Sequence, residues 1–368
     1  MVRPRGSDTM FSQSSLVPQA QRVRRARRRA RLSGALATAA IASALAIGRA
    51  DAAGDPGTQL TAVQDPLLGD TVARRQQPRG VVAGDEFVFW TNGDGSVRKA
   101  PVAGGRTVIV AKGFTNPTEM AIDRDHAGAP MVYWLDAGAG NDDAQCRGKA
   151  DGSIQRLDGA VVTGLTCPAN LRYFGGRVYW LERHTGEIRW TSGNGGGEIK
   201  TIAKTDGFGA GFGLDANGLV YFAAGSHELT RTSLYVNLSE VLSKDPKIDP
   251  RFASPSTDGV YYMQGRAIMR APLDGSAPTE RYTLPTSAVR AVWQQGSALV
   301  YTTWGADVFQ SYGGEPMLVA DRQRGSLRGV AANASHIFWI TDNLVKRAPL
   351  QPPPPALDEF TGGSSNRF

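Results

Sequence analysis

Short stretches of alternating apolar and polar residues, bounded by clusters of glycine, asparagine and aspartate, run through most of this 368-residue chain. Alternation with a period of two predicts β-strands, and the turn-forming clusters between them predict hairpins. Long stretches with the hydrophobic period of an amphipathic helix are lacking in the sequence. The pattern therefore predicts an all-β protein.

One strand pattern, a β-branched residue followed by aromatic residues, recurs along the chain. The copies begin at Val88, Val132, Val178, Val220, Val260, Val300 and Ile337. They are therefore separated by 44, 46, 42, 40, 40 and 37 residues. A period of about 40 residues matches four strands with their turns, which is the size of one propeller blade.

The residues around each copy support this interpretation. An apolar strand and a tight turn come before the copy, and a glycine-rich turn, an alternating strand, a second turn and a further strand come after it. We therefore predict a β-propeller over residues 70–350, with seven four-stranded blades, or six as the alternative.

The seventh copy lacks its outermost strand, because the chain continues into Pro352–Pro355 and proline cannot donate to a strand ladder. At the other end of the repeats, residues 72–77 (VARRQQ) resemble residues 319–324 (VADRQR), which join blade six to blade seven. We therefore predict that residues of about 70–75 supply the missing strand. This closure would remove an exposed strand edge from the last blade.

Three copies carry a conspicuous tetrapeptide: Phe89-Trp90-Thr91-Asn92, Tyr133-Trp134-Leu135-Asp136 and Tyr179-Trp180-Leu181-Glu182. They resemble the Tyr-Trp-Thr-Asp repeats of low-density-lipoprotein receptors, the class B repeats, and of their bacterial exported relatives. The resemblance spans residues 70–350 and is weak in copies four to six. It implies a propeller used for binding rather than catalysis. The receptor domains have six blades, whereas seven copies are present here.

The N-terminal segment differs in composition from the repeats. Arg22 to Arg31 carry seven positive charges, seventeen uncharged residues follow from Leu32 to Gly48, and Ala50-Asp51-Ala52 comes next. This order predicts a signal peptide over residues 1–53, cleaved near Ala52, with an uncleaved membrane anchor as the alternative. Residues 54–69 are then a linker, and the proline-rich residues 351–368 a flexible C-terminal tail.

The net charge of +7 belongs to that N-terminal segment. Residues 1–53 hold ten arginines against two aspartates, so residues 54–368 carry a net charge of −1. A nearly neutral propeller offers no electrostatic basis for binding nucleic acid. We expect an exported protein, in the periplasm, the cell envelope or the extracellular space, that touches a membrane only through an uncleaved signal.

The chain contains two cysteines, Cys146 and Cys167. In an exported protein this pair predicts a disulfide. Asp136, Asp142 and Asp143 precede Cys146 and offer weak candidate ligands for Ca²⁺, although solvated acidic side chains are the simpler explanation. We expect no cofactor and no other metal site.

The loops that join one blade to the next open onto one end of the central channel. Alignment of the copies places six residues at roughly equivalent positions there: Arg79, Glu119, Asn170, Gly211, Arg290 and Arg328. Arginines from neighbouring blades would attract a carboxylate or phosphate at this channel mouth. The alternative is that they bind loop carbonyls and Glu119.

No residues match a known catalytic pattern, so we predict a non-catalytic binding or scaffold protein. We expect it to be a monomer and to recognise a protein, peptide or glycan through one face, with the channel-mouth residues as its ligand-binding group. The alternative is a lactonase-like propeller hydrolase or lyase with its site in the central channel. The fold does not decide between them, because propellers carry many functions.

Overall fold

The computed structural model describes residues 69–352 apart from several short segments. The segments outside the description are 125, 127–129, 140–145, 147, 206–210, 216–218, 225–226, 234–238, 257–258, 284–288, 296–297, 304, 313–315, 322 and 324. Side chains are also not described at 219–220, 223–224, 249–252, 256, 281–282, 289–291 and 293–295. The described residues lie within one compact unit, Ala62–Phe368. The predicted signal peptide falls outside them.

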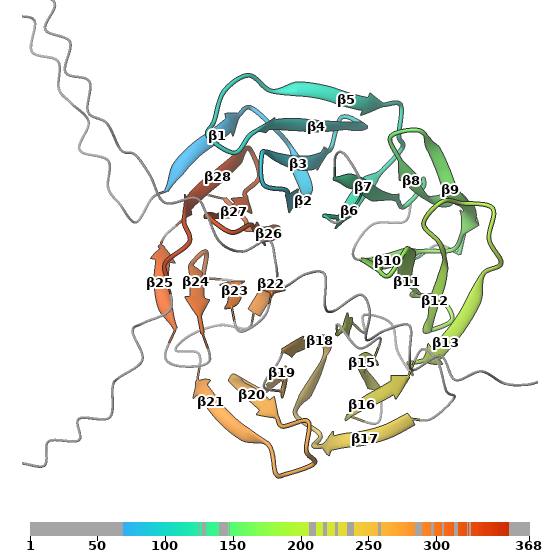
Figure 1. Ribbon diagram of the computed structural model, residues 1–368, viewed down its shortest axis with the longest axis vertical. Coiled ribbons are helices and arrows are strands. Elements are labelled where there is room, and N and C mark those ends of the chain that lie inside the picture. The colour runs from blue at the N-terminus through green and yellow to red at the C-terminus, as the bar shows by residue number, and fades with distance from the viewer. Residues whose placement is uncertain are drawn as a thin grey trace, which may run out of the picture. The chain divides into compact units, whose positions relative to one another are not determined.

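Seven four-stranded antiparallel sheets surround a common axis as the blades of a β-propeller (Figure 1). Blade 1 consists of β2 (Pro78–Ala83), β3 (Phe87–Asn92), β4 (Ser96–Pro101) and β5 (Val108–Lys112). Blade 2 consists of β6 (Pro117–Asp123), β7 (Met131–Asp136), β8 (Gly152–Arg156) and β9 (Gly159–Leu165). Blade 3 consists of β10 (Pro168–Phe174), β11 (Arg177–Glu182), β12 (Glu187–Ser192) and β13 (Lys200–Lys204).

The remaining blades follow the same order from the axis outwards. Blade 4 consists of β14 (Phe212–Leu214), β15 (Leu219–Ala224), β16 (Glu228–Ser233) and β17 (Ser239–Lys244). Blade 5 consists of β18 (Ile248–Ser256), β19 (Gly259–Gln264), β20 (Ala267–Ala271) and β21 (Thr279–Thr283). Blade 6 consists of β22 (Val289–Gln295), β23 (Ala298–Thr303), β24 (Val308–Ser311) and β25 (Met317–Ala320). The prediction of seven four-stranded blades is confirmed.

Blade 7 combines the two ends of the propeller. Its inner strands are β26 (Gly329–Ala332), β27 (His336–Ile340) and β28 (Leu344–Pro349), and its outer strand is β1 (Asp70–Arg74). Asp70 pairs with Arg347 and Arg74 with Leu344, with a register shift between Thr71 and Ala73. The predicted closure by an N-terminal strand is confirmed.

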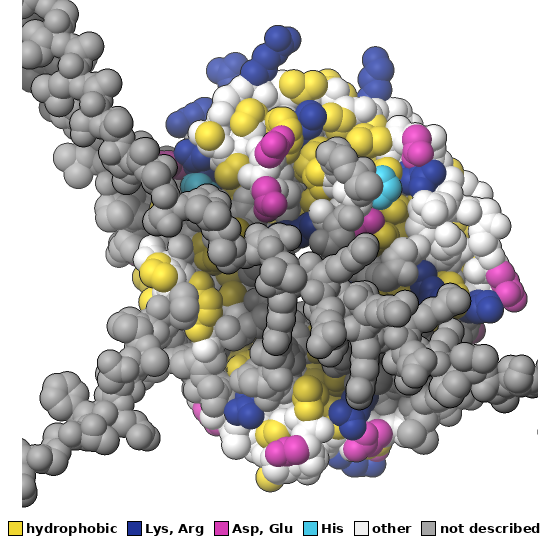
Figure 2. Space-filling view, in the orientation of Figure 1, with side chains coloured by type: hydrophobic (Ala, Val, Ile, Leu, Met, Phe, Trp, Pro, Cys, Tyr) yellow, Lys and Arg dark blue, Asp and Glu magenta, His cyan; other side chains and the backbone are white. Residues whose placement is uncertain are grey.

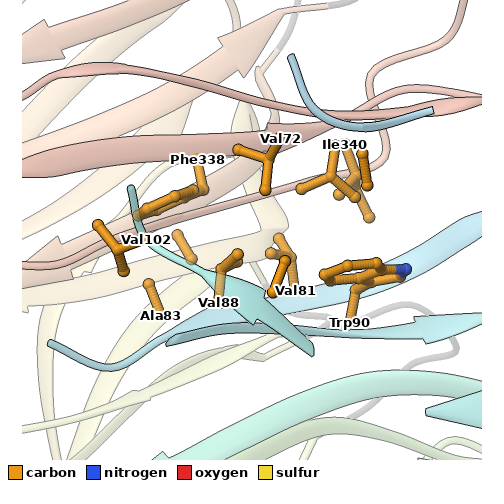
Figure 3. Close-up of a cluster of buried hydrophobic side chains, with 12 residues drawn as sticks. Val72, Val81, Ala83, Val88, Trp90, Val102, Phe338 and Ile340 are labelled. Atoms are coloured by element: carbon orange, nitrogen blue, oxygen red, sulfur yellow. The ribbon is translucent and has the colours of Figure 1, made fainter. Parts of the chain in front are cut away.

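The repeated aromatic residues fill the seams between blades. Trp90, Trp134, Trp180 and Trp339 occupy the same position of the repeat and are fully buried. Trp90 packs with Val72 of the closing strand and with Phe338 and Ile340 of blade 7 (Figure 3). Large rings suit this position because neighbouring twisted sheets diverge and leave wedge-shaped gaps.

Helices that could span a membrane do not occur among the residues described between 69 and 352. On the face seen in Figure 2, acidic and basic side chains are interspersed around the rim of the described blades.

Candidate functional site

We call the first residues of the inner strands, together with the loops before them, the entrance rim. The inner strands are the ones nearest the central axis of the propeller (Figure 1). The rim contains the predicted ligand-binding residues Arg79, Glu119, Asn170, Arg290 and Arg328.

Glu119 joins blade 2 to blade 3. Its carboxylate Oε1 accepts a hydrogen bond from the backbone N–H of Asn170 (2.9 Å), and Oε2 accepts one from that of Leu171 (3.0 Å). Asn170 has a φ of 54°, in the left-handed region that non-glycine residues seldom occupy. The two bonds therefore hold an unusual backbone segment at the start of β10.

Arg79 lies at the seam between blades 1 and 2. Its Nη1 donates to Oδ1 of Asn116, a neutral acceptor. Among the residues described, no ion pair involves Arg79, which is exposed.

The structure describes the side chain of only one of the other two predicted arginines. Arg328 binds within its own blade, where both Nε and Nη2 lie 3.1 Å from Oδ1 of Asp342. The side chain of Arg290 is outside the described structure. The structure thus brings Glu119 and Asn170 together, places Arg79 one blade away and engages Arg328 with a carboxylate.

Strand register also shifts the alignment by one residue. Val81, Met120 and Val330 all pair with the repeated tryptophan of their blades. Gly80 and Gly329, rather than Arg79 and Arg328, are therefore equivalent to Glu119. A Cβ on Gly80 would lie 2.2 Å from the carbonyl oxygen of Thr118, so this position must remain a glycine for β6 to approach.

The last residue of the repeated tetrapeptide caps the loop that precedes the inner strand. Asp136 accepts backbone hydrogen bonds from Thr115 (Oδ2, 3.0 Å), Asn116 (Oδ1, 2.7 Å) and Gly138 (Oδ1, 3.3 Å). Asn92 accepts one from Gln77, and Glu182 one from Thr166. These contacts give the acidic or amide end of the tetrapeptide a structural role.

Of the three weak Ca²⁺ candidates, the structure describes Asp136. Asp136 uses its oxygens to cap a loop, and Asp142 and Asp143 lie outside the described residues. Within the described part of the chain, no group of three His, Cys, Asp or Glu residues is arranged to hold a metal ion.

The predicted disulfide joins Cys146 and Cys167, whose Cα atoms are 5.6 Å apart. Cys167 is buried and immediately precedes β10, and Cys146 belongs to the long connection between β7 and β8. The bond therefore attaches that connection to the entrance rim beside Asn170. It also agrees with an exported protein, since such crosslinks persist in oxidising compartments.

Arg172 is a rim-side residue that the sequence alignment missed. It lies two residues after Asn170 on the same inner strand and is only partly exposed. Burial lowers the pKa of its guanidinium, and the negative charge of Glu119 opposes that shift. A register-based alignment of the inner strands reveals it as a charged residue at a position that is otherwise small or apolar.

A second polar cluster lies at the far ends of the inner strands. The Tyr173 hydroxyl donates to Oδ2 of buried Asp123 (2.5 Å), and His126 Nδ1 lies 3.7 Å from the same oxygen. The Tyr173 ring stacks on Tyr133 with centroids 5.1 Å apart. Burial and the bond to Asp123 raise the pKa of Tyr173, which therefore stays protonated.

Solved structures share this fold. Virginiamycin B lyase from Staphylococcus aureus is 14% identical, with a TM-score of 0.58 over 76% of this chain and 98% of the lyase chain. The extracellular domain of a one-component system from B. thetaiotaomicron is 9% identical, with a TM-score of 0.56 over 78% of this chain and 40% of that chain. A chain of a nidogen/laminin complex is 17% identical, with a TM-score of 0.45 over 70% and 85%.

No protein-family model matches the sequence, and no curated protein matches it either. At 9–14% identity the lyase and the extracellular domain show a common fold and no more. The site must therefore be interpreted from its own residues.

Proposed function

We propose that this chain is an exported, non-catalytic propeller that binds a protein, peptide or glycan through the entrance rim. The observation that carries the proposal is that the carboxylate at the entrance rim, and the two that cap its loops, already have hydrogen-bond donors. Glu119, Asp136 and Glu182 all accept hydrogen bonds from backbone N–H groups. Carboxylates engaged in this way shape a surface and are poorly placed to exchange protons with a substrate.

The basic groups of the rim supply the binding chemistry. Arg79 is exposed and bound to a neutral amide, so its charge is not cancelled by a described carboxylate. Arg172 adds a second positive charge on blade 3. The disulfide and the Glu119 contacts hold the intervening backbone in one conformation, which reduces the entropy lost when a ligand binds.

The test is a ligand screen with face-specific variants. The protein from residue 54 onwards is screened against displayed peptides and a glycan array, and the affinity of each positive ligand is measured by titration calorimetry. We expect Arg79→Glu to weaken binding at least tenfold, through loss of one charge-assisted contact and repulsion of the ligand.

Arg106→Glu is the matched control, because Arg106 is exposed in the connection between β4 and β5, at the opposite end of blade 1. We expect it to bind within twofold of the unmodified protein. Equal affinities for both variants would show that the ligand does not bind at the entrance rim.

A propeller hydrolase or lyase is the second candidate function. The observation that favours it is the Asp123–Tyr173–His126 cluster, in which a protonated phenol and an imidazole share one buried carboxylate. Such groups can donate and accept protons. Hydrolysis or elimination with a panel of lactones and esters, lost in Asp123→Asn and retained in Arg79→Glu, would replace the binding proposal with this one.

A further inference from the structure

Arg172 interrupts a regular feature of the inner strands. It pairs with Tyr179, the second residue of the repeated core in blade 3. The residues in this register position in the other six blades are Val82, Ala121, Gly213, Ser254, Val292 and Ala331. All six are small or apolar, so packing of the ring does not require an arginine here.

The same comparison shows which way the position faces. Val82 of blade 1 packs with Met120 and Trp134 of blade 2. In the same way, Ala121 of blade 2 packs with Leu171 of blade 3. The register therefore directs Arg172 to the seam with blade 4. The inner strand of blade 4 carries Gly213 at its equivalent position, and the cluster in that seam is apolar, with Tyr179, Phe212 and Phe222.

The guanidinium of Arg172 is poorly compensated. Its Nη1 donates one hydrogen bond, to the carbonyl oxygen of Leu171 (2.9 Å). The negative charge of Glu119 interacts with Arg172 electrostatically. Both Glu119 oxygens, however, already accept hydrogen bonds from backbone N–H groups. Among the described residues, no ion pair of 4 Å or less joins Arg172 to Glu119. A guanidinium has five N–H donors, and the structure gives an acceptor to one of them among the residues that it describes.

A partly buried arginine fits a planar oxyanion. Two N–H groups of one guanidinium can bind both oxygens of a carboxylate, and the low local dielectric strengthens such a pair. We propose that Arg172 binds a carboxylate group of the ligand at the inner margin of the seam between blades 3 and 4. This inference rests on the proposed function and names the ligand as an acidic one, such as an acidic peptide or a uronic-acid glycan.

The direct test observes the guanidinium itself. The Nε–Hε resonance of Arg172 in protein labelled with ¹⁵N-arginine is assigned by its loss in Arg172→Lys. Sodium succinate is then titrated at constant ionic strength, and inorganic phosphate is titrated in parallel. We expect succinate to shift this resonance with saturation, and phosphate to shift it less.

Calorimetric affinities for succinate provide the second measurement. We expect Arg172→Gln to weaken binding about 10- to 100-fold, the range expected for loss of a hydrogen bond to a charged group. Arg177→Gln is the matched control, because Arg177 belongs to the same blade and its guanidinium lies over the Trp190 ring. We expect Arg177→Gln to bind succinate as the unmodified protein does.

An unmoved Arg172 resonance, or equal affinity in Arg172→Gln, would overturn the proposal. Tighter binding of phosphate than of succinate would overturn the assignment of a carboxylate. If Arg172→Gln does not fold, the resonance and the Arg172→Lys affinity still decide the matter. If a ligand from the screen binds more weakly to Arg79→Glu but equally well to Arg172→Gln, this inference alone is refuted. If succinate binds at Arg172 but the screen yields no peptide or glycan ligand, the proposed function alone is refuted.

Discussion

Two seams of the ring each contain a glutamine at the equivalent position, and the two glutamines make different contacts. At the seam between blades 6 and 7, Gln323 donates to the carbonyl of Asp321 (2.9 Å), and its Oε1 accepts from both Trp339 Nε1 (3.2 Å) and Lys346 Nζ (2.8 Å). Gln323 therefore connects the linker, the seam tryptophan and the third strand of blade 7.

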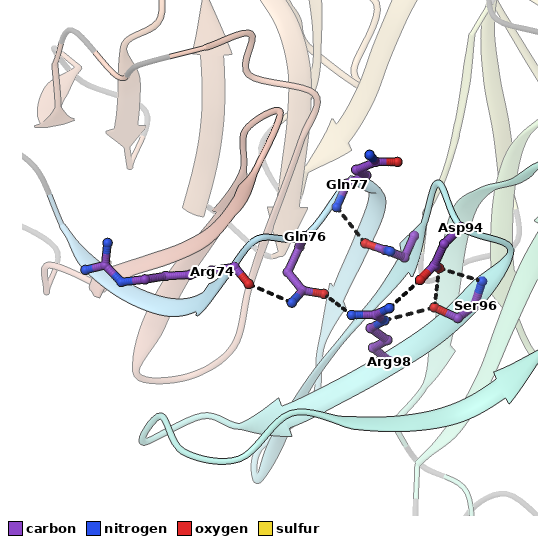
Figure 4. A network of polar contacts seen from close by, with 7 residues as sticks. Arg74, Gln76, Gln77, Asp94, Ser96 and Arg98 are labelled. Atoms are coloured by element: carbon purple, nitrogen blue, oxygen red, sulfur yellow. Dashed lines mark hydrogen bonds and ion pairs between the residues drawn. The ribbon is translucent and has the colours of Figure 1, made fainter.

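Gln76 stands at the matching place between blades 7 and 1. It donates to the carbonyl of Arg74 (2.8 Å), and its Oε1 accepts from Arg98 Nη1 (2.7 Å) (Figure 4). Arg98 is the residue of β4 that corresponds to Lys346 of β28. Trp90, however, finds no hydrogen-bond acceptor for its buried Nε1 among the described residues.

The difference shows how the closing seam is stabilised. Arg98 also binds Asp94 and Ser96, and the polar network at this seam is more exposed than Gln323 and Lys346 are at the other. The closing seam has in addition a whole strand, β1, that no other linker contributes. We infer that strand pairing dominates the closing seam, and that a compact buried network dominates the seam before it.

Removal of the closing strand should have the largest effect. Chains beginning at residue 77 lack β1, which buries Val72 and Ala73, whereas chains beginning at residue 69 keep it. We expect the shorter chain to lose roughly 3–5 kcal/mol of unfolding free energy, from lost apolar burial and exposure of the β28 edge. Urea denaturation of the two chains measures the difference. Equal midpoints would contradict a role of β1 in closure.

Substitution of the two glutamines should separate the seams. Gln323→Leu removes the acceptor of Trp339 and of Lys346 and should cost about 2–3 kcal/mol. Gln76→Leu should cost only about 1 kcal/mol, because Arg98 keeps Asp94 and Ser96 as partners. Unfolding free energies from urea titration test this order, and the reverse order would refute our interpretation of the two networks.

The smallest effect concerns acid stability of the closing seam. Burial raises the pKa of Asp94, but hydrogen bonds from Ser96 and Asn92 and the charge of Arg98 outweigh it and lower the pKa to about 2. A depressed carboxyl pKa stabilises the fold above the unfolded value of 3.8, and this contribution disappears as the pH falls from 3.8 towards 2.

Asp94 is 46% exposed, so its contribution is below about 1 kcal/mol. Asp94→Asn should lower the melting temperature slightly at pH 7, and the gap should narrow as the pH approaches 2. Thermal melts of both proteins across this range measure the gap. A gap that widens in acid would contradict the direction of the pKa shift.

The blades and their closure could be predicted from the sequence because each repeat carries the same local pattern. The likeness of residues 72–77 to residues 319–324 has a physical basis, since Gln76 and Gln323 each donate a hydrogen bond to the carbonyl two residues earlier. The presence of two cysteines in a chain expected to be exported was likewise sufficient to predict their disulfide.

The entrance rim was predicted less well. One extra residue bulges at the start of several inner strands, such as that between Pro78 and Gly80, and it moves every following side chain to the other side of the strand. Blades 2 and 3 carry the same kind of bulge, so an alignment of these strands needs their pairing with the second strand of each blade. The sequence alignment lacked that pairing, placed Arg79 opposite Glu119, and overlooked Arg172.

The pairing of β1 with β28 also constrains when the ring can form. The strand that is synthesised first finds its partner among the last strands to be synthesised, so almost the whole propeller separates the two in the chain. Contacts of such long range are slow to form because a large loop must close first. A protein that is exported from its N-terminus would consequently present β1 to the new compartment as an unpaired strand until blade 7 arrives, and the ring would be completed only after translocation ends.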